Sequence, residues 1–321
     1  MDRNLAIEFV RLTEAAALAA ARFMSRGDER LAEQAAAKIM YEVLNSVEVH
    51  GRIVIGMGEA AETSTLYSGE TVGKEHPDQV DLALDPLDGT NICATGGPNS
   101  ISVIAIAPPG GLVPLPMMLM EKIVVGPRAK GAIDIDLAPA ENLDNIASAL
   151  QCRREDLIVA ILDRPRHRTL IEAVRKSGAH VKLIGDGEVS TSLTACRREG
   201  GIDVVMGTGD AGKAVITAAG LKCLGGDFQG RLLPQSEEEK EKLNDFDPER
   251  VLTLSDLVPT DFVMFAATGV TDGDLLKGVR FVRGGATTNS IVMRSKSGTI
   301  RFLSTEHHFD REPDYNSRSP F

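Results

Sequence analysis

The chain has 321 residues, of which 43% are hydrophobic and 25% charged, and its net charge at pH 7 is -11. This composition is typical of a globular protein with a sizeable core, and the length suggests about two domains. The negative net charge argues against nucleic-acid binding, which requires basic surface to displace the counterions of phosphates. A phosphorylated small molecule is compatible with it if metal ions, basic side chains or backbone N–H groups neutralise the phosphate locally.

The cysteines and the N-terminus favour a soluble, cytoplasmic protein. The 4 cysteines are widely spaced and form no C-x-x-C pair, so we expect reduced thiols rather than disulfides or a zinc cluster. The N-terminal segment carries Asp2 and Glu8 and does not resemble a signal peptide. No stretch reaches about 18 uninterrupted apolar residues, so we expect no membrane-spanning segment.

Hydrophobic periodicity predicts that the chain opens with two helices and continues with strands. Apolar residues recur at helical spacing from Leu5 to Met24 and from Asp28 to Asn45. Short β-branched or alternating runs between Gly and Pro predict strands. The predicted strands of this part are 52–55, 80–84, 100–106 and 120–125.

From about residue 140 the predicted strands and helices alternate. Strands are expected at 157–162, 181–184 and 202–206, and helices at 166–176, from 189 and at 210–221. This alternation implies crossover connections and a parallel or mixed sheet. Later strands at 261–266, 280–282, 289–294 and 299–304 suggest that the chain returns to an earlier sheet. We therefore expect two intimately joined α/β units, residues 1–139 and 140–321.

Two polar segments interrupt this second part. The acidic run Ser236 to Lys242 is most simply a solvated helix, as mixed charge runs usually are. The polar tail from Glu306 is expected to be loosely held.

The six residues 85–90, with the sequence DPLDGT, follow one of the predicted strands and carry the strongest chemical signal. Two carboxylates three residues apart beyond a strand end, Asp85 and Asp88, are suitable ligands for Mg²⁺ or Mn²⁺. Gly89 allows a tight turn, and Thr90 offers a hydroxyl to a phosphate. By itself the segment is also consistent with an ordinary turn, because D-P and D-G dipeptides are common turn punctuation.

The context of this segment resembles a known family. The same pattern after a hydrophobic strand is typical of the lithium-sensitive, metal-dependent sugar and inositol phosphatases. Nearly the whole chain resembles one branch of them, class II fructose-1,6-bisphosphatase. The matching segments include RNLAIEF (3–9), VVGP (124–127), PRH (165–167), GRLL (230–233), ATG (267–269) and GDLL (273–276). The resemblance implies a layered α/β/α/β/α sugar-phosphatase fold with two mixed sheets, and a homodimer or homotetramer.

The resemblance also implies a reaction and the residues for it. The reaction is hydrolysis of the 1-phosphate of fructose 1,6-bisphosphate, with sedoheptulose 1,7-bisphosphate as another candidate substrate. Mn²⁺ or Mg²⁺ would activate water and stabilise the leaving oxygen. The positions that match metal ligands are Glu33, in place of an Asp, Asp85 and Asp88. Those that match substrate contacts are Asp88, Gly89, Thr90, Arg164, Arg166, Asp186, Gly187 and Glu188. The candidate catalytic residues are Thr90, Glu59 and Glu62, and either glutamate would need a backbone change to replace a missing ligand.

Several positions depart from the family pattern. Residues 56–64 read GMGEAAETS where the family has G-E-G-E-x-D-E-A-P. Met57 therefore stands where a metal-ligating Glu belongs, and a thioether is a poor ligand for Mg²⁺ or Mn²⁺. Ala61 stands where an acidic residue that helps to activate water belongs. Leu119 replaces a substrate-contacting Tyr, Asp210 replaces a Gly near the phosphate, and Lys213 replaces the final metal-ligating Glu.

Lys213 is the most informative of these changes, because it places a cation where the family has an anion. Its ammonium is expected to lie where a metal ion would and to neutralise Asp85 and Asp88. The alternative is that the helix has slipped and Lys213 points to solvent. His167, next to Arg166, is more consistent with a positioning residue than with a metal ligand.

Three functional hypotheses follow. The first is a metal-dependent sugar bisphosphatase with weak or lost activity, since losing one preorganised group costs on the order of 10²–10³ in rate. The second is a non-catalytic sugar-phosphate-binding or regulatory paralogue, with an anion pocket at Thr90, Arg164 and Arg166. Such a paralogue could form a hetero-oligomer with an active relative. The third is a phosphatase for a different sugar phosphate, because Leu119 and Asp210 alter the pocket.

Overall fold

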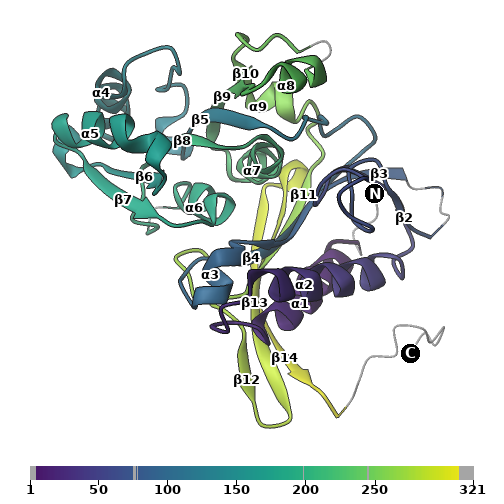
Figure 1. Cartoon of the computed structure of the whole chain (residues 1–321). Coiled ribbons are helices and arrows are strands. Elements are labelled where there is room, and N and C mark those ends of the chain that lie inside the picture. The colour runs from purple at the N-terminus through teal and green to yellow at the C-terminus, as the bar shows by residue number, and fades with distance from the viewer. Residues whose placement is uncertain (1–4, 75–76, 78, 198, 244–245, 311–321) are drawn as a thin grey trace.

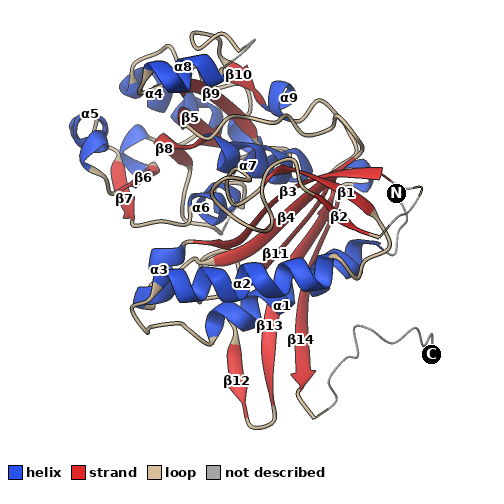
Figure 2. Ribbon diagram, turned by 45° about the vertical axis from the view of Figure 1, so that its right-hand side comes forward, coloured by secondary structure: helices blue, strands red, loops and turns tan. Residues whose placement is uncertain are grey.

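Two β-sheets, one of 8 strands and one of 6, form the frame of the structure, and helices fill the space between them and cover both outer faces (Figure 1). The computed structural model describes residues 5–74, 77, 79–197, 199–243 and 246–310. Each sheet contains parallel and antiparallel pairs. The layers therefore run α/β/α/β/α with two mixed sheets (Figure 2), which confirms the predicted fold class.

The first sheet combines strands from both ends of the chain. Its order is β12-β13-β11-β4-β3-β1-β2, and β14 pairs with the free side of β13. The strands are β1 (His50–Ile55), β2 (Thr71–Gly73), β3 (Gln79–Asp88), β4 (Ile101–Ala107), β11 (Met264–Gly269), β12 (Arg280–Val282), β13 (Gly285–Arg294) and β14 (Thr299–His308). Only β1 and β3 pair in parallel among the described strands of this sheet.

The second sheet has the order β10-β9-β5-β8-β6-β7. Its strands are β5 (Leu119–Val125), β6 (Ile158–Leu162), β7 (His180–Ile184), β8 (Val204–Asp210), β9 (Asp227–Leu233) and β10 (Leu252–Thr253). The pairs β6–β7 and β6–β8 are parallel, which confirms the crossover units predicted from the alternation of strands and helices. Strand β5 precedes residue 139 and yet lies in this sheet. The division of the chain into units at 139/140 stays a prediction.

The outer helices bury one apolar face each. On the first sheet lie α1 (Leu5–Ala21), α2 (Glu29–Leu44) and α3 (Thr90–Thr95), and on the second sheet lie α4 (Pro139–Leu150) and α5 (Arg168–Lys176). The residues that set the predicted period of α1, such as Phe9, Leu12 and Ala16, are all buried. The Asp28 side chain accepts a hydrogen bond from the Leu31 backbone N–H at 2.9 Å and so caps the start of α2.

The middle layer is formed by α6 (Glu188–Thr194) and α7 (Ala211–Leu224). Helix α7 contacts strands of both sheets and is apolar around most of its surface, as expected of a helix between two sheets. Gly220 shows how close this packing is, because a Cβ atom there would lie 2.5 Å from a side-chain carbon of Leu193. The N-terminal end of α7 follows directly on β8, so the sheet fixes where the helix starts.

Three features differ from the sequence predictions. Strand β3 does not end at Leu84 but continues to Asp88, because β4 pairs with it along that length. Strand β14 reaches His308, so the expected loose tail does not begin at Glu306, and residues 311–321 lie outside the described part of the chain. Strands β2, β9 and β10 and helices α3, α4 and α9 (Leu254–Leu257) were not predicted. The acidic run forms α8 (Glu237–Lys242), which has no buried residue.

No helix in the described residues is both long and apolar enough to cross a membrane.

Candidate functional site

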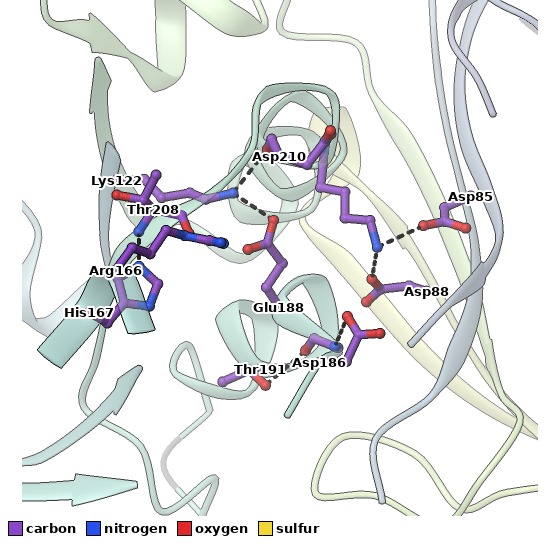
Figure 3. A network of polar contacts seen from close by, with 12 residues as sticks. Asp85, Asp88, Lys122, Arg166, His167, Asp186, Glu188, Thr191, Thr208 and Asp210 are labelled. Atoms are coloured by element: carbon purple, nitrogen blue, oxygen red, sulfur yellow. Dashed lines mark hydrogen bonds and ion pairs between the residues drawn. The ribbon is translucent and has the colours of Figure 1, made fainter. Parts of the chain in front are cut away.

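The strand, turn and helix formed by residues 79–95 present the acidic segment to the middle layer. The pairing of β3 with β4 shifts register between Asp85 and Asp88, and this irregularity lets two residues three apart face the same side. Figure 3 shows their carboxylates converging. Gly89 follows with a φ of 87°, a left-handed conformation that favours glycine, and α3 begins at Thr90. The sequence expectation of a tight turn after the second carboxylate is met at Gly89.

Lys213 reaches both carboxylates from the first turn of α7. Its Nζ lies 2.7 Å from Oδ1 of Asp88 and 3.2 Å from Oδ2 of Asp85. The helix start is fixed, because Oδ1 of Asp210 accepts a hydrogen bond from the Lys213 backbone N–H at 2.8 Å. The predicted contact between this ammonium and the two carboxylates is therefore present, and the alternative of a solvent-facing Lys213 is excluded.

The charges at this contact shift one another's pKa. Burial raises the pKa of Asp88 to about 7 although Lys213 opposes the shift, and the nearby charges of Asp85 and Asp186 raise it further. Burial by itself would lower the pKa of Lys213, but Asp88 and Asp85 raise it well above its ordinary value. Burial and then Asp85 raise the pKa of Glu33, which lies on α2. Asp88 is fully buried, and its Oδ2 has no hydrogen-bond partner among the described residues.

A pocket of about 180 Å³ opens beside Lys213. Its polar lining consists of Glu33, Ser68, Asp85, Thr90, Asp210 and Lys213, and its apolar lining includes Ile55, Met57, Leu84, Leu87, Leu115, Met117 and Ile216. Of the residues predicted from the sequence, the pocket thus brings together Glu33, Asp85 and Thr90. Asp88 lies behind this lining, where it pairs with Lys213.

The loop between β1 and β2 holds the candidate catalytic glutamates away from this pocket. Both Glu59 and Glu62 are exposed, and Oε2 of Glu62 accepts a hydrogen bond from the Glu59 backbone N–H. The Glu59 carboxylate also pairs with Lys242 at 3.4 Å. Neither glutamate lines the pocket, and Ala61 between them is exposed. Their catalytic role stays a prediction.

The predicted basic substrate contacts also lie outside the pocket lining. The guanidinium of Arg166 donates from Nε and Nη2 to the carbonyl oxygen of Thr208, at 3.2 and 2.9 Å. Arg164 donates to the carbonyl oxygen of Asp163. Asp186 lies close enough to Asp88 to raise its pKa, and Gly187 takes a left-handed conformation at the start of α6. Leu119 opposes Asp210 in the β5–β8 register and is not a lining residue.

Glu188, the last predicted substrate contact, is buried in an ion pair. Its Oε1 accepts from Nζ of Lys122 at 2.7 Å, and the same ammonium donates to the carbonyl oxygen of Asp210 at 3.0 Å (Figure 3). The sequence predictions missed Lys122. The signal that could have identified it is that Lys122, unlike its charged neighbour Glu121, alternates into the buried face of β5, where a lysine requires a partner.

His167 forms a hydrogen bond to strand β8 at Thr208. Its Nδ1 donates to the carbonyl oxygen of Leu162, and its Nε2 accepts from the Thr208 backbone N–H, each at 2.7 Å. This arrangement uses the neutral imidazole, and burial lowers the pKa of His167 accordingly. The predicted positioning role of His167 agrees with these contacts.

The residues around Lys213 do not fit the metal centre that the resemblance implies. Within the described residues, no three His, Cys, Asp or Glu side chains are placed to hold one metal ion. The Lys213 ammonium already provides a positive charge to Asp85 and Asp88, and a second cation at the same carboxylates would be repelled by it.

Comparisons with known proteins identify relatives over almost the whole chain. The family described as bacterial fructose-1,6-bisphosphatase, glpX-encoded, matches residues 3–307. A D-fructose 1,6-bisphosphatase class 2/sedoheptulose 1,7-bisphosphatase from Synechococcus sp. (strain JA-2-3B'a(2-13)) is 43% identical over 337 aligned residues, which cover 97% of each chain. A protein of the same description from Synechococcus elongatus is 39% identical and is matched over 98% of its length by 97% of this chain.

Among solved structures, the extragenic suppressor protein suhB from Bartonella henselae is similar over 61% of this chain and 74% of its own. The identity is 17% and the TM-score 0.35.

Proposed function

The chain belongs to the glpX-type, class II fructose-1,6-bisphosphatase family, and from this premise we propose that it is a sugar bisphosphatase whose activity is weak or lost. Its substrate would be fructose 1,6-bisphosphate, hydrolysed at the 1-phosphate, or sedoheptulose 1,7-bisphosphate. Mn²⁺ or Mg²⁺ is the cofactor that family membership suggests, but because the described residues around Lys213 do not fit it, the proposal is that metal binding is weakened or lost. The observation that carries the proposal is the Lys213 ammonium in contact with Asp85 and Asp88.

The pocket offers hydroxyl groups to a phosphate and few groups that could hydrolyse it. The hydroxyl of Thr90 lines the pocket and can donate to a phosphate oxygen. Asp85 and Asp88 are both engaged in ion pairs with Lys213, so neither carboxylate is free to take a proton from water. Glu33 also lines the pocket, and its raised pKa makes it the best remaining group to accept that proton. A single weak base without a preorganised partner predicts slow turnover.

A second candidate function is a non-catalytic sugar-phosphate-binding or regulatory paralogue, in which Lys213 permanently replaces a metal ion. The same contact favours it, because the ammonium is fixed and requires no added cation. The acidic lining opposes it: Glu33, Asp85 and Asp210 surround this one ammonium and repel a phosphate dianion. Ligand binding in the presence of a chelator therefore distinguishes the two functions.

The decisive experiment measures phosphate release and ligand binding on the same purified protein. We expect little release from fructose 1,6-bisphosphate or sedoheptulose 1,7-bisphosphate with either Mn²⁺ or Mg²⁺. The variant Met57→Glu/Lys213→Glu should bind Mn²⁺ more tightly than wild type and release phosphate faster. Its matched control is Met57→Gln/Lys213→Gln, which has the same shape without the charges.

Each outcome has a clear meaning. Robust Mn²⁺-dependent release by the wild type would reject weak or lost activity. Tight calorimetric binding of fructose 1,6-bisphosphate in EDTA, without turnover, would favour the paralogue. If the glutamate variant binds Mn²⁺ no better than the glutamine control, these positions do not form the site. A homodimer or homotetramer is part of the proposal, and light scattering tests it.

A further inference from the structure

The end of β8 and the start of α7, residues 207–213, form a junction that side chains from three other elements hold in place. His167 and Arg166, which precede α5, bond to the backbone of Thr208. Lys122 from β5 bonds to the carbonyl oxygen of Asp210, and Glu188 of α6 pairs with Lys122. Figure 3 shows these groups converging on the junction.

The sequence of the junction leaves room for these side chains. A Cβ atom at Gly209 would lie 2.0 Å from Oε2 of Glu188, and one at Gly207 would lie 3.0 Å from Nε2 of His167. The two glycines therefore allow the carboxylate and the imidazole to approach the strand. A residue with a Cβ atom at position 207 or 209 would displace the side chain of His167 or Glu188.

The pair of Lys122 and Glu188 is the most buried ion pair at the junction. Its side chains are 7% and 9% exposed. Removing two charges from water is costly, and only good geometry with additional hydrogen bonds offsets that cost. Here the ammonium divides its hydrogen bonds between the Glu188 carboxylate and the carbonyl oxygen of Asp210, so it links α6 to the last residue of β8.

Asp210 connects Lys122 to Lys213 through two hydrogen bonds. Its carbonyl oxygen is held by Lys122, and its carboxylate caps the first turn of α7 through the Lys213 backbone N–H. The side chain of Lys213 then spans from that turn to Asp85 and Asp88. A displaced Asp210 would move the base of the Lys213 side chain relative to the two carboxylates.

We infer that Lys122 is a positioning residue of the candidate site: together with Glu188 it fixes Asp210 and thereby the Lys213 ammonium against Asp85 and Asp88. The inference rests on the proposed function only in taking this pocket as the place where sugar phosphate binds. It assigns Glu188 a supporting role in place of direct contact with the sugar.

The test measures how readily the Lys213 ammonium reacts, since the Lys213 side chain is only 26% exposed and its ammonium is paired with two carboxylates. Trace acetylation followed by peptide mass spectrometry gives the rate at Lys213 relative to the exposed Lys38 of α2 in the same molecule. We expect Lys122→Met to raise this relative rate about threefold or more. A factor of about three corresponds to nearly the weakest coupling usually found between residues of one hydrogen-bond network. An unchanged rate overturns the inference.

Two further variants separate positioning from general loss of stability. Leu143→Ala removes a fully buried side chain of α4 in the outer part of the second sheet and should destabilise the protein without changing the rate at Lys213. Lys122→Met/Glu188→Met removes both charges and should recover stability, but neither methionine can donate to Asp210, so the raised rate should remain. If Leu143→Ala raises the rate as much at a matched loss of stability, or if the double variant restores the wild-type rate, Lys122 serves only stability. Should Lys122→Met not fold, the double variant decides alone.

Calorimetric binding of fructose 1,6-bisphosphate in Mn²⁺ to the same variants separates this inference from the proposed function. A wild type that does not bind rejects the proposed function, while the acetylation rates still decide the role of Lys122. If the wild type binds, Lys122→Met should weaken binding, and equal affinities would reject the link from Lys122 to the ligand site.

Discussion

The ammonium of Lys213 lies 2.7 Å from Oδ1 of Asp88, a carboxylate that is fully buried. A buried carboxylate is stable only if a cation, hydrogen bonds or a proton compensates its charge. In this chain the compensating cation is the ammonium of Lys213, a residue of the same polypeptide. Part of the negative charge of Asp85 and Asp88 is therefore compensated before any metal ion binds, and the consequences can be measured on the protein alone.

Replacing Lys213 by Met tests how much this contact stabilises the fold. The variant keeps most of the side-chain volume but leaves Asp85 and Asp88 facing each other without a cation. We expect the free energy of unfolding to fall by about 2–4 kcal/mol, somewhat less than for a fully buried pair that loses one partner, because the Lys213 side chain is 26% exposed. Urea unfolding gives the value, and Lys38→Met on the exposed face of α2 is the control, which should change it by less than about 0.5 kcal/mol. Equal stability of the two variants would show that the contact contributes nothing.

The raised pKa of Asp88 predicts a particular dependence of stability on pH. Burial raises the pKa from 3.8 to about 7, so on raising the pH through this range the unfolded chain loses a proton that the folded protein keeps. This contribution to the free energy of unfolding is fully present below pH 3.8 and is lost as the pH rises to about 7.

The matched variant for this effect is Asp88→Asn, which cannot ionise. The stability of wild type minus that of Asp88→Asn should fall between about pH 4 and 7, by at most about 1.4 kcal/mol per pH unit, and level off above. Urea unfolding over this range measures the difference. A difference that grows with pH would mean that Lys213 outweighs burial and keeps Asp88 ionised throughout.

The sequence predicted the parts of this structure that depend on local pattern or on matching positions. The spacing of Phe9, Leu12 and Ala16 predicted α1, because a helix that covers a sheet must bury one face. The family pattern placed Lys213 beside Asp85, and the structure contains that contact.

The sequence did not predict features that arise from pairing between distant segments. Strand β3 extends to Asp88 only because β4 pairs with it, and no local sequence pattern predicts this pairing. The bond from Lys122 to Glu188 joins residues 66 apart in sequence. Arg166 matched a substrate contact by position, yet its guanidinium is bonded to the carbonyl oxygen of Thr208, which only the fold brings near.

Glu14 provides a test of the first sheet at a distance from the pocket. This carboxylate on α1 is 5% exposed, and its Oε1 accepts from the hydroxyls of Thr305 at 2.7 Å and Thr288 at 3.2 Å. It therefore ties α1 to β13 and β14. Glu14→Ala should lower the free energy of unfolding by about 2–4 kcal/mol, because it removes two hydrogen bonds to a buried carboxylate and takes away the acceptor of the Thr305 hydroxyl. The Thr288 hydroxyl, in contrast, can still bond to His307.

The control for Glu14 lies two turns earlier on the same helix. The Glu8 side chain is 40% exposed and pairs with Arg11 at 2.8 Å, so Glu8→Ala should cost no more than about 0.5 kcal/mol. Both variants are compared by urea unfolding at neutral pH. If Glu14→Ala is as mild as Glu8→Ala, the hydroxyls find water instead, and Glu14 does not anchor α1.

Gly209 gives a backbone test of the junction that supports Lys213. Gly209→Ala would place a methyl group 2.0 Å from Oε2 of Glu188, so the carboxylate must move and weaken its pair with Lys122. We expect a loss of about 1–3 kcal/mol in the free energy of unfolding, the usual range for overpacking. We also expect faster acetylation of Lys213, as for Lys122→Met. Gly185→Ala is the matched control, since a Cβ atom there has no neighbour within 4 Å, and it should leave both quantities unchanged. Normal stability and normal acetylation in Gly209→Ala would mean that the junction adapts without disturbing Lys213.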